Sequence, residues 1–158
     1  MHEAFVVFGS NINPERNLYT AWVKLQHRVE VVASSSIWES PPYGSVGPDF
    51  LNAVVQVNSS NDLEALKWSV LRKIETSLGR VRTADKFASR PIDLDIFIFD
   101  SIIQDANLWE LAYLAAPCAE LLPDLPDPTS GRPLAEVAVQ MAAEQNTVRR
   151  FRSFLELV

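Results

Sequence analysis

Cysteine and histidine are scarce in this chain of 158 residues, and the common nucleotide-binding loops are absent. The one cysteine, Cys118, has no second cysteine for an internal disulfide, as is typical of reducing compartments, and we expect it to be a small core residue. The two histidines, His2 and His27, are too few to favour a zinc site or a Ser-His-Asp triad. Neither G-x-x-x-x-G-K-S/T nor G-x-G-x-x-G occurs, which excludes the two most common phosphate-binding fingerprints.

Long apolar runs and an excess of positive charge are missing as well. No run approaches the length of a bilayer span, and the N-terminus has no basic segment followed by an apolar signal core, so we expect a cytoplasmic protein that does not enter membranes. The net charge of −6 argues against binding to nucleic acid or to an anionic membrane. With 47% hydrophobic residues, the chain is expected to form a single domain over residues 1–158.

The spacing of apolar residues predicts an α+β fold. Short apolar or alternating runs predict strands, and stripes at three- and four-residue spacing predict helices. Asn61 with Glu64 indicates the start of the second helix, and Gly79 indicates its end. The order is the βαββαβ pattern of ferredoxin-like folds, with helices packed on a mainly antiparallel sheet. The predicted strands are 3–9, 31–39, 50–58 and 90–100, and the predicted helices begin after Pro14 and at Asn61.

Beyond Asp100 the pattern is weaker. Ile102 and Ile103 are typical of a short edge strand, and residues 108–122 have a helical composition that Pro117 interrupts. Pro133 is well placed in the first turn of a last helix, which adds a C-terminal helix to the core. The sequence leaves open the structure of the basic tail that follows.

Two carboxylates stand in an otherwise apolar predicted strand. Asp93 and Asp95 are two residues apart, so their side chains face the same way. Carboxylates brought together beside a core need a cation to neutralise them. A cationic segment leads directly into this strand and contains Arg80, Arg82, Lys86 and Arg90.

Two interpretations fit this pairing of an acidic strand with a cationic segment. Mg²⁺ is commonly held by one or two carboxylates together with substrate phosphates, and two carboxylates leaning inward would bracket two ions. The arginines would then bind polyphosphate oxygens, which is the arrangement of a phosphoryl-transfer site. In the alternative, the same arginines only form structural ion pairs with the two aspartates.

The order of four short motifs resembles the 6-hydroxymethyl-7,8-dihydropterin pyrophosphokinase family of folate biosynthesis. They are Ser40-Pro41-Pro42, Asp49 to Ala53, Gly79 to Arg82 and Arg90 to Ile96, supported by Gly9-Ser10-Asn11. The resemblance implies a ferredoxin-like fold and transfer of the pyrophosphoryl group of MgATP to the hydroxymethyl group of a pterin, releasing AMP. It implies small-molecule partners, the pterin alcohol and ATP, with no nucleic acid and no membrane, and we expect a monomer.

On the nucleotide side, the resemblance implies two Mg²⁺ ions bound by Asp93 and Asp95, with ATP as co-substrate. The other residues that it points to are basic, apart from one glutamate late in the second helix. Arg80, Arg82 and Arg90 would take part in catalysis, the first two on a mobile loop, and Glu75, Lys86 and again Arg90 would bind the nucleotide.

On the pterin side, Asn52 matches the asparagine whose amide reads the pterin edge, and Phe50 matches an aromatic beside the ring. Without the resemblance, Phe50 would be interpreted as a core aromatic and Asn52 as a loop cap. Tyr113 aligns with the second stacking aromatic, and Trp109 is another candidate. The predicted pterin-binding set is completed by Pro42, Tyr43 and Ser40, which stands where the family usually has threonine.

The segment from Ile103 to Pro117 departs from the family. The family usually has a V-P-H-P-R-like segment and an Arg-x-Phe here, whereas this chain has a shorter stretch without histidine or arginine. Each lost charge-assisted contact to ATP would cost about 1.5–3 kcal/mol, so weaker nucleotide binding or slower turnover is expected. The alternative function is a diverged member that binds pterin or nucleotide with weak or no turnover. Candidates to fold back and replace the cations are Arg149, Arg150 and Arg152.

Overall fold

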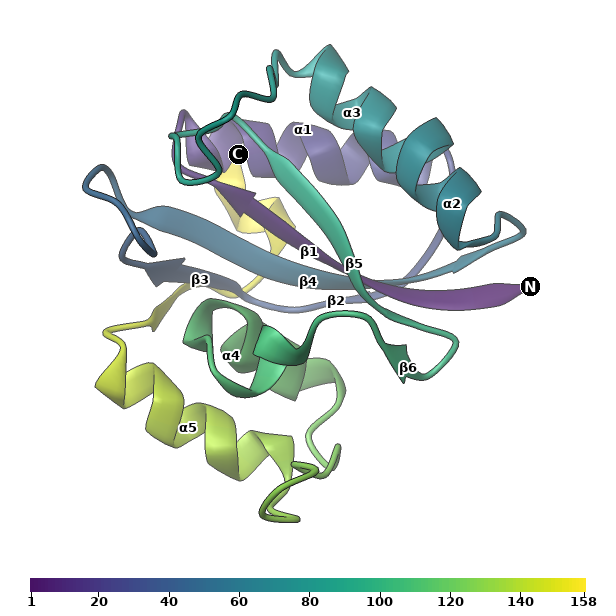
Figure 1. The fold of residues 1–158 in the computed structure, drawn as a ribbon. Helices are drawn as coiled ribbons and strands as arrows, with labels where there is room; N and C mark the ends of the chain where they lie inside the picture. The colour runs from purple at the N-terminus through teal and green to yellow at the C-terminus, as the bar shows by residue number, and fades with distance from the viewer.

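The computed structural model describes residues 1–158 and has a seven-stranded sheet between two layers of helices (Figure 1). All strand pairs are antiparallel, and the order is β6-β5-β1-β4-β3-β7, with β2 also paired to β4. The central strands β1 and β4 are the longest and most buried, as their apolar alternation predicts. The strands are β1 (His2–Ser10), β2 (Glu30–Ser34), β3 (Ile37–Ser40), β4 (Phe50–Ser59), β5 (Asp93–Phe99), β6 (Ile102–Ile103) and β7 (Val148–Phe151).

The predicted ferredoxin-like core is confirmed. If β2 and β3 are counted as one strand, the four core strands lie in the order fourth, first, third, second, as a split βαβ arrangement requires. The prediction of one unbroken strand over residues 31–39 is wrong, because the chain leaves the ladder at Ser35 and Ser36. There the backbone N–H and hydroxyl of Ser36 donate to the Glu120 carboxylate at 3.1 and 2.6 Å, so the break ties the sheet to the helix that carries Glu120.

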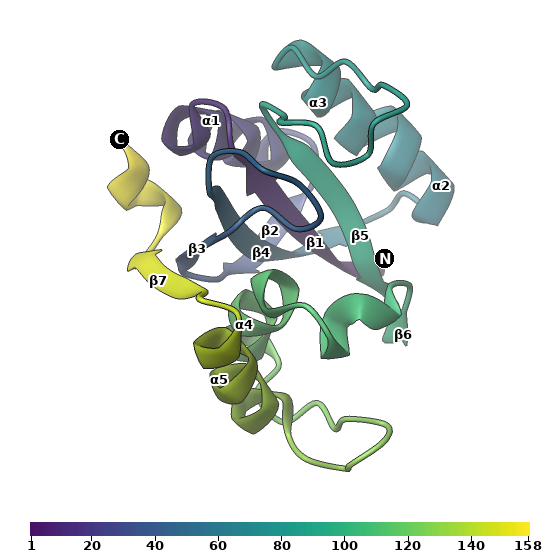
Figure 2. The same cartoon turned by 60° about the vertical axis from the view of Figure 1, so that its left-hand side comes forward.

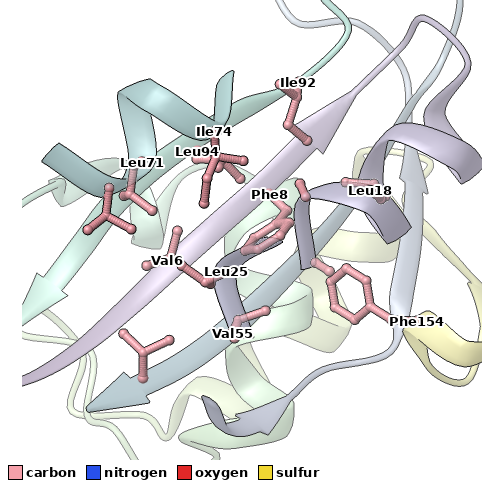
Figure 3. Packing of buried hydrophobic residues seen from close by; sticks show 14 of the residues in the cluster. Val6, Phe8, Leu18, Leu25, Val55, Leu71, Ile74, Ile92, Leu94 and Phe154 are labelled. Carbon is pink, nitrogen blue, oxygen red and sulfur yellow. The ribbon is translucent and has the colours of Figure 1, made fainter. Parts of the chain in front are cut away.

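One face of the sheet is covered by α1 (Pro14–Gln26) and by a continuous helical segment that follows β4 (Figure 1). That segment comprises α2 (Leu63–Ala65), a π-helical stretch (Leu66–Leu71) and α3 (Arg72–Ser77). Figure 3 shows the core between these helices and the sheet, where side chains of β1 such as Phe8 meet Leu25 and Ile74. The short C-terminal 3₁₀ helix (Phe154–Leu157) completes this core by stacking Phe154 on Trp22.

The ends of the α2–α3 segment are defined by one aspartate and one glycine. Asp62, rather than the predicted Asn61, caps the start, since its carboxylate accepts a hydrogen bond from the Ala65 N–H at 2.8 Å. The Asn61 side chain instead donates to the Ser59 hydroxyl at 2.9 Å. The predicted stop at Gly79 is confirmed, because this residue has φ of +89°, which glycine adopts without strain.

The other face of the sheet is covered by α4 (Ala112–Leu121) and α5 (Leu134–Glu144), the latter being the predicted last helix. A 3₁₀ turn (Ala106–Trp109) leads into α4. Pro117 lies inside α4 without ending it, contrary to the predicted interruption. It removes the N–H that would bond the Tyr113 carbonyl, but burial of this apolar helix against the sheet offsets the loss.

The basic tail forms the last strand, β7, which pairs with β3 at the sheet edge far from β5 (Figure 2). Arg150 lies 3.7 Å from the carboxylate of Glu39 on that strand. The suggestion that Arg149, Arg150 and Arg152 fold back to replace lost cations beside the acidic strand is therefore wrong. None of the helices is long and apolar enough to cross a lipid bilayer.

Cys118 lies on α4 in the core of this second face and is fully buried, as expected for a structural thiol. Burial raises the pKa of the Cys118 thiol to about 12. Because the thiolate is the reactive form, we expect the folded protein at pH 8 to react with a thiol reagent such as DTNB at least about 100-fold more slowly than the chain in guanidinium chloride. Equal rates in the two states would contradict the burial.

Candidate functional site

A pocket of about 220 Å³ lies at the end of the sheet where β5 begins. Its floor comes from β1, β4 and β5, and its walls come from α4 and the two loops 41–49 and 78–92. Figure 2 shows both loops at this end of the sheet. Nine predicted site residues line it, namely Ser40, Tyr43, Phe50, Asn52, Lys86, Arg90, Asp93, Asp95 and Tyr113, and Val7, Gly9, Pro41, Phe87, Asp105 and Leu114 complete the lining.

Strand register brings the two predicted halves of the site together. Gly9 on β1 pairs with Asn52 on β4 and with Asp93 on β5, so the amide and the carboxylate lie on either side of one glycine. A Cβ atom at Gly9 would lie 3.4 Å from the Asn52 amide oxygen and 3.9 Å from the Phe50 ring. A side chain at this position would therefore enter the space between the two halves.

Asp93 and Asp95 both face the pocket, as their spacing on the strand predicts. Each carboxylate has an arginine beside it: Arg90 lies 3.1 Å from Asp93, and Arg72 lies 3.4 Å from Asp95. Loss of hydration and the neighbouring charge of Asp93 raise the pKa of Asp95 to about 6. The β5 part of the pocket floor thus carries two neighbouring carboxylates, and the nearby arginines neutralise their charges only in part.

The cationic loop is attached to this acidic strand by its arginines. Arg82 lies 3.7 Å from Asp93, and Arg80 donates to the Ile92 carbonyl at 3.2 Å. Arg90 donates to the Ala88 carbonyl at 3.1 Å and to the Lys86 carbonyl, which fixes the loop beside Asp93. Of the four basic residues of this loop, Lys86 and Arg90 line the pocket, whereas Arg80 and Arg82 do not. The arrangement is compatible with both interpretations, in which these residues are ion-pair partners of the aspartates or cations for a bound polyphosphate.

Glu75 does not line the pocket but organises the groups behind it. Its side chain is buried and accepts hydrogen bonds from the Leu94 N–H at 2.8 Å, from Arg82 at 2.9 Å and from Arg72 at 3.3 Å. The carboxylate therefore links α3, the cationic loop and β5 at one point. Its contact partners in the structure are protein groups, and the nucleotide-binding role that the resemblance implies for Glu75 stays a prediction.

Asn52 and Ser40 form a buried polar pair at the opposite end of the pocket. The Asn52 amide donates to the Ser40 hydroxyl at 2.7 Å, which fixes the orientation of the amide. Phe50 and Tyr43 lie beside this pair, and Pro41 lines the pocket in place of the predicted Pro42. A planar ligand with polar edges fits between such aromatic faces and one fixed amide.

The shortened segment after β5 supplies Asp105, Tyr113 and Leu114 to the pocket and no cation. Tyr113 is placed where the sequence predicts an aromatic wall, and burial raises its pKa to about 12, so the phenol stays protonated at neutral pH. The other aromatic candidate, Trp109, is partly buried, packs against the core under α4 and does not line the pocket.

A model of the family described as 7,8-dihydro-6-hydroxymethylpterin-pyrophosphokinase (HPPK) matches residues 5–123 of the chain. This range contains all residues of the pocket and of its supporting arginines. The chain belongs to the HPPK family.

The relatives of this chain include proteins named as pyrophosphokinases and a protein named as bifunctional. The chain is 33% identical over 151 residues to the 2-amino-4-hydroxy-6-hydroxymethyldihydropteridine pyrophosphokinase of Synechocystis sp., covering 89% of this chain and 76% of that one. The Methylorubrum extorquens protein of the same name is 31% identical over 137 residues, covering 79% and 85%. The mitochondrial folate synthesis bifunctional protein of Arabidopsis thaliana is 33% identical over 133 residues, covering 77% of this chain but only 24% of the plant protein.

Solved structures confirm the HPPK fold. A crystal structure of HPPK-DHPS in complex with substrates superimposes with a TM-score of 0.70 at 12% identity, covering 94% of this chain and 46% of that one. Wild-type Plasmodium falciparum HPPK-DHPS with pterin and p-hydroxybenzoate gives a TM-score of 0.69 at 10% identity, covering 92% and 44%. The chain thus spans about half the length of these bifunctional structures and about a quarter of the plant protein.

The donors in this HPPK site suit a hard cation. Nowhere does the chain gather three or more His, Cys, Asp or Glu side chains into a metal-binding group. Asp93 and Asp95 offer carboxylate oxygens alone, which suits Mg²⁺, since that ion takes one or two carboxylates and fills its shell with phosphates and water. Zinc would need nitrogen or sulfur ligands that this pocket lacks.

Besides the unpredicted lining residues such as Phe87 and Asp105, the site contains Arg72 behind the acidic pair, a residue that the sequence-based predictions do not include. It lies on α3, donates to the Leu94 carbonyl at 3.0 Å, pairs with Asp95 and sits over the Trp68 ring at 5.7 Å. Its position one turn before Glu75 was the available signal, because residues three apart on a helix share a face. The segment after β5 has lost its cations, but Arg72 still supplies one beside the acidic pair from the opposite side.

Proposed function

We propose that this HPPK-family chain transfers the pyrophosphoryl group of ATP to 6-hydroxymethyl-7,8-dihydropterin in folate biosynthesis. The hydroxymethyl oxygen forms a bond to the β-phosphorus, the bond from that phosphorus to the α–β bridging oxygen breaks, and AMP leaves. The observation that carries the proposal is one pocket with an acidic pair and cations at one end and a fixed amide between aromatic side chains at the other. ATP carries a highly charged polyphosphate, which matches the charged end, and the pterin is a planar ring with polar edges, which matches the end with the amide and the aromatic side chains.

At the acidic end, Asp93 and Asp95 would hold two Mg²⁺ ions. When bound, Mg²⁺ neutralises phosphate charge and helps to orient the transferred group. Arg82 and Arg90, now paired with Asp93, would exchange that contact for phosphate oxygens, which accept the same paired N–H groups. Lys86 lines the pocket and adds a further positive charge, while Arg80 holds the base of the loop.

At the other end, the Asn52 amide would bind the polar edge of the pterin, with Ser40 fixing its orientation. Phe50 and Tyr113 would contact the two ring faces. The loop that carries Pro41, Pro42 and Tyr43 would close the side, with Pro41 and Tyr43 lining the pocket. Such positioning brings the acceptor hydroxyl close to the phosphates. Positioning and charge neutralisation supply most of the rate in phosphoryl transfer.

We further propose that residues 1–158 act as a single domain and as a cytoplasmic monomer, with the pterin alcohol and ATP as its partners. The single domain is supported by the pocket, whose lining residues come from strands of one sheet, from a helix packed on that sheet and from the connecting loops. The net charge of −6 supports small anionic substrates bound by a local cationic loop rather than nucleic acid.

The direct test is to incubate the purified chain with ATP, Mg²⁺ and the pterin alcohol and to follow AMP. AMP that forms only when all three are present supports the proposal. If saturating substrates give no AMP above background while calorimetry detects pterin binding, the chain is a binding module and the proposed activity is wrong.

Replacing Asn52 by alanine is expected to raise the KM for the pterin alcohol by about 10- to 100-fold, because a buried hydrogen-bonding partner of the ligand is lost. The KM for ATP should change little, since Asn52 lies at the end of the pocket away from the cations. Steady-state AMP assays with each substrate varied in turn measure both constants. Equal changes in the two constants would argue against a pterin-specific role.

A further inference from the structure

Asn11 bonds both loops that wall the pocket. It lies just after β1, is only 6% exposed and does not line the pocket itself. Its amide nitrogen donates to the Pro48 carbonyl at 3.4 Å and to the Ser89 hydroxyl at 3.1 Å. Its amide oxygen accepts from the Arg90 N–H at 2.7 Å, and its own backbone N–H donates to the Arg90 carbonyl at 3.2 Å. One side chain therefore joins the end of the first loop to the end of the second.

The two loops belong to different halves of the site. Loop 41–49 follows Ser40 and contributes Pro41 and Tyr43 to the end with the fixed amide, whereas loop 78–92 contributes Lys86 and Arg90 to the cationic end. Their tips also touch, because the rings of Tyr43 and Phe87 lie 6.3 Å apart. The tip contact is exposed, whereas the Asn11 contacts are part-buried, because Asn11 itself is buried and reaches out to the two loops.

We propose that Asn11 is a positioning residue that couples the two halves, so that binding of one substrate raises the affinity for the other. The proposal rests on the proposed function for the identity of the two substrates. Ordering loop 41–49 around the acceptor would hold the Pro48 carbonyl, and through Asn11 it would hold the backbone of Arg90. The Arg90 guanidinium lies 3.1 Å from Asp93, so the effect reaches the acidic pair.

Asparagine suits this position because one buried side chain must donate N–H groups to Pro48 and Ser89 and accept a hydrogen bond from the Arg90 N–H. Aspartate would keep the acceptor for the Arg90 N–H but would face the Pro48 carbonyl with a second oxygen. Alanine would remove all three side-chain contacts while keeping the backbone bond. Asn11→Asp therefore removes the donor to the Pro48 carbonyl while keeping acceptors for the Arg90 N–H and the Ser89 hydroxyl, whereas Asn11→Ala removes all three contacts.

The test compares Asn11→Ala and Asn11→Asp with Asn17→Ala. Asn17 is a matched control, because its amide donates to the Ile12 carbonyl at 2.6 Å and makes no hydrogen bond to either loop. The affinity for a non-hydrolysable ATP analogue with Mg²⁺ is measured by calorimetry, with and without the pterin alcohol. In the unchanged chain and in Asn17→Ala we expect the pterin to strengthen analogue binding by about 5- to 150-fold, and by less than about twofold in both Asn11 variants.

Hydrogen exchange of the substrate-free protein gives a second measurement that needs no ligand. Asn11→Ala should speed exchange at residues 79–90 and 41–49 and leave β1 and β4 unchanged. Ser89→Ala removes one Asn11 partner from an exposed position that does not endanger folding, and it should speed exchange in the same loop by a smaller factor.

Retention of the full pterin effect in a folded Asn11→Ala variant overturns the coupling role. Unchanged loop exchange in both Asn11→Ala and Ser89→Ala also overturns it, whether or not the protein forms AMP. If the unchanged chain forms no AMP but the loops loosen as expected, the proposed function fails and the structural link between the loops stands.

Discussion

Replacing Asp95 by asparagine should lower the rate of AMP formation about 1000-fold or more without unfolding the protein. The proposed metal site consists of two carboxylates, so the substitution removes half of its charge, and a 1000-fold loss corresponds to about 4 kcal/mol of transition-state stabilisation. The amide is close in shape to the carboxylate. The Asp95 side chain is also 49% exposed, which leaves the core untouched.

The stability of the Asp95→Asn variant follows from the pKa of the carboxyl group. Its value of about 6 in the folded chain lies above the ordinary 3.8, so the folded state binds the Asp95 proton more tightly than the unfolded state does. The contribution of the Asp95 carboxyl group to the free energy of unfolding therefore falls as pH rises from about 4 to about 6. At pH 7 the neutral asparagine should leave the melting temperature equal to or above that of the unchanged chain.

AMP assays and thermal unfolding at pH 7 measure the two effects together. Asp124→Asn is the matched control, because it removes one exposed aspartate that does not line the pocket. An Asp95→Asn variant with a normal AMP rate would remove this carboxylate from the proposed metal site. A large fall in melting temperature would instead show that the carboxylate supports the fold through Arg72.

The elements that the sequence predicts well are those with local causes. The apolar stripe of α1, the long alternation of β4 and the positive φ at Gly79 all follow from residues close in the chain. The break at Ser35 and Ser36 depends on Glu120, which is 84 residues away from Ser36. The sequence around Ser35 and Ser36 gives no indication that Glu120 is their partner.

The candidate site likewise has some features that follow from local sequence and others that depend on contacts between distant residues. That Asp93 and Asp95 share a face follows from strand geometry alone. Arg72 and Asn11 act through contacts between elements that the fold brings together, and the helical spacing of Arg72 and Glu75 does not by itself reveal the contact with Asp95. The lost cations after β5 suggested a weakened nucleotide site, and the tail does not replace them, but Arg72 supplies a positive charge that the sequence pattern did not reveal.

Replacing Glu75 by glutamine should destabilise the fold by about 3 kcal/mol and also slow AMP formation. Glu75 accepts hydrogen bonds from the Leu94 N–H, Arg82 and Arg72 at a buried point. Glutamine keeps one acceptor oxygen, but its NH₂ group must face one of these three donors. Breaking a buried charged network by altering one partner costs several kcal/mol, because the remaining groups stay desolvated and unpaired.

A loss of about 3 kcal/mol corresponds to a fall in melting temperature of roughly 6–12 °C for a chain of this size. Glu136→Gln is the matched control, since it alters an exposed ion pair with Arg132 at 3.4 Å, which should contribute less than about 1 kcal/mol. If Glu75→Gln melts like that control, the Leu94 and arginine contacts contribute little to folding. A normal melting temperature with slow AMP formation would point to direct nucleotide contact. The combined loss is expected because one carboxylate fixes both the start of the acidic strand and the arginine that faces it.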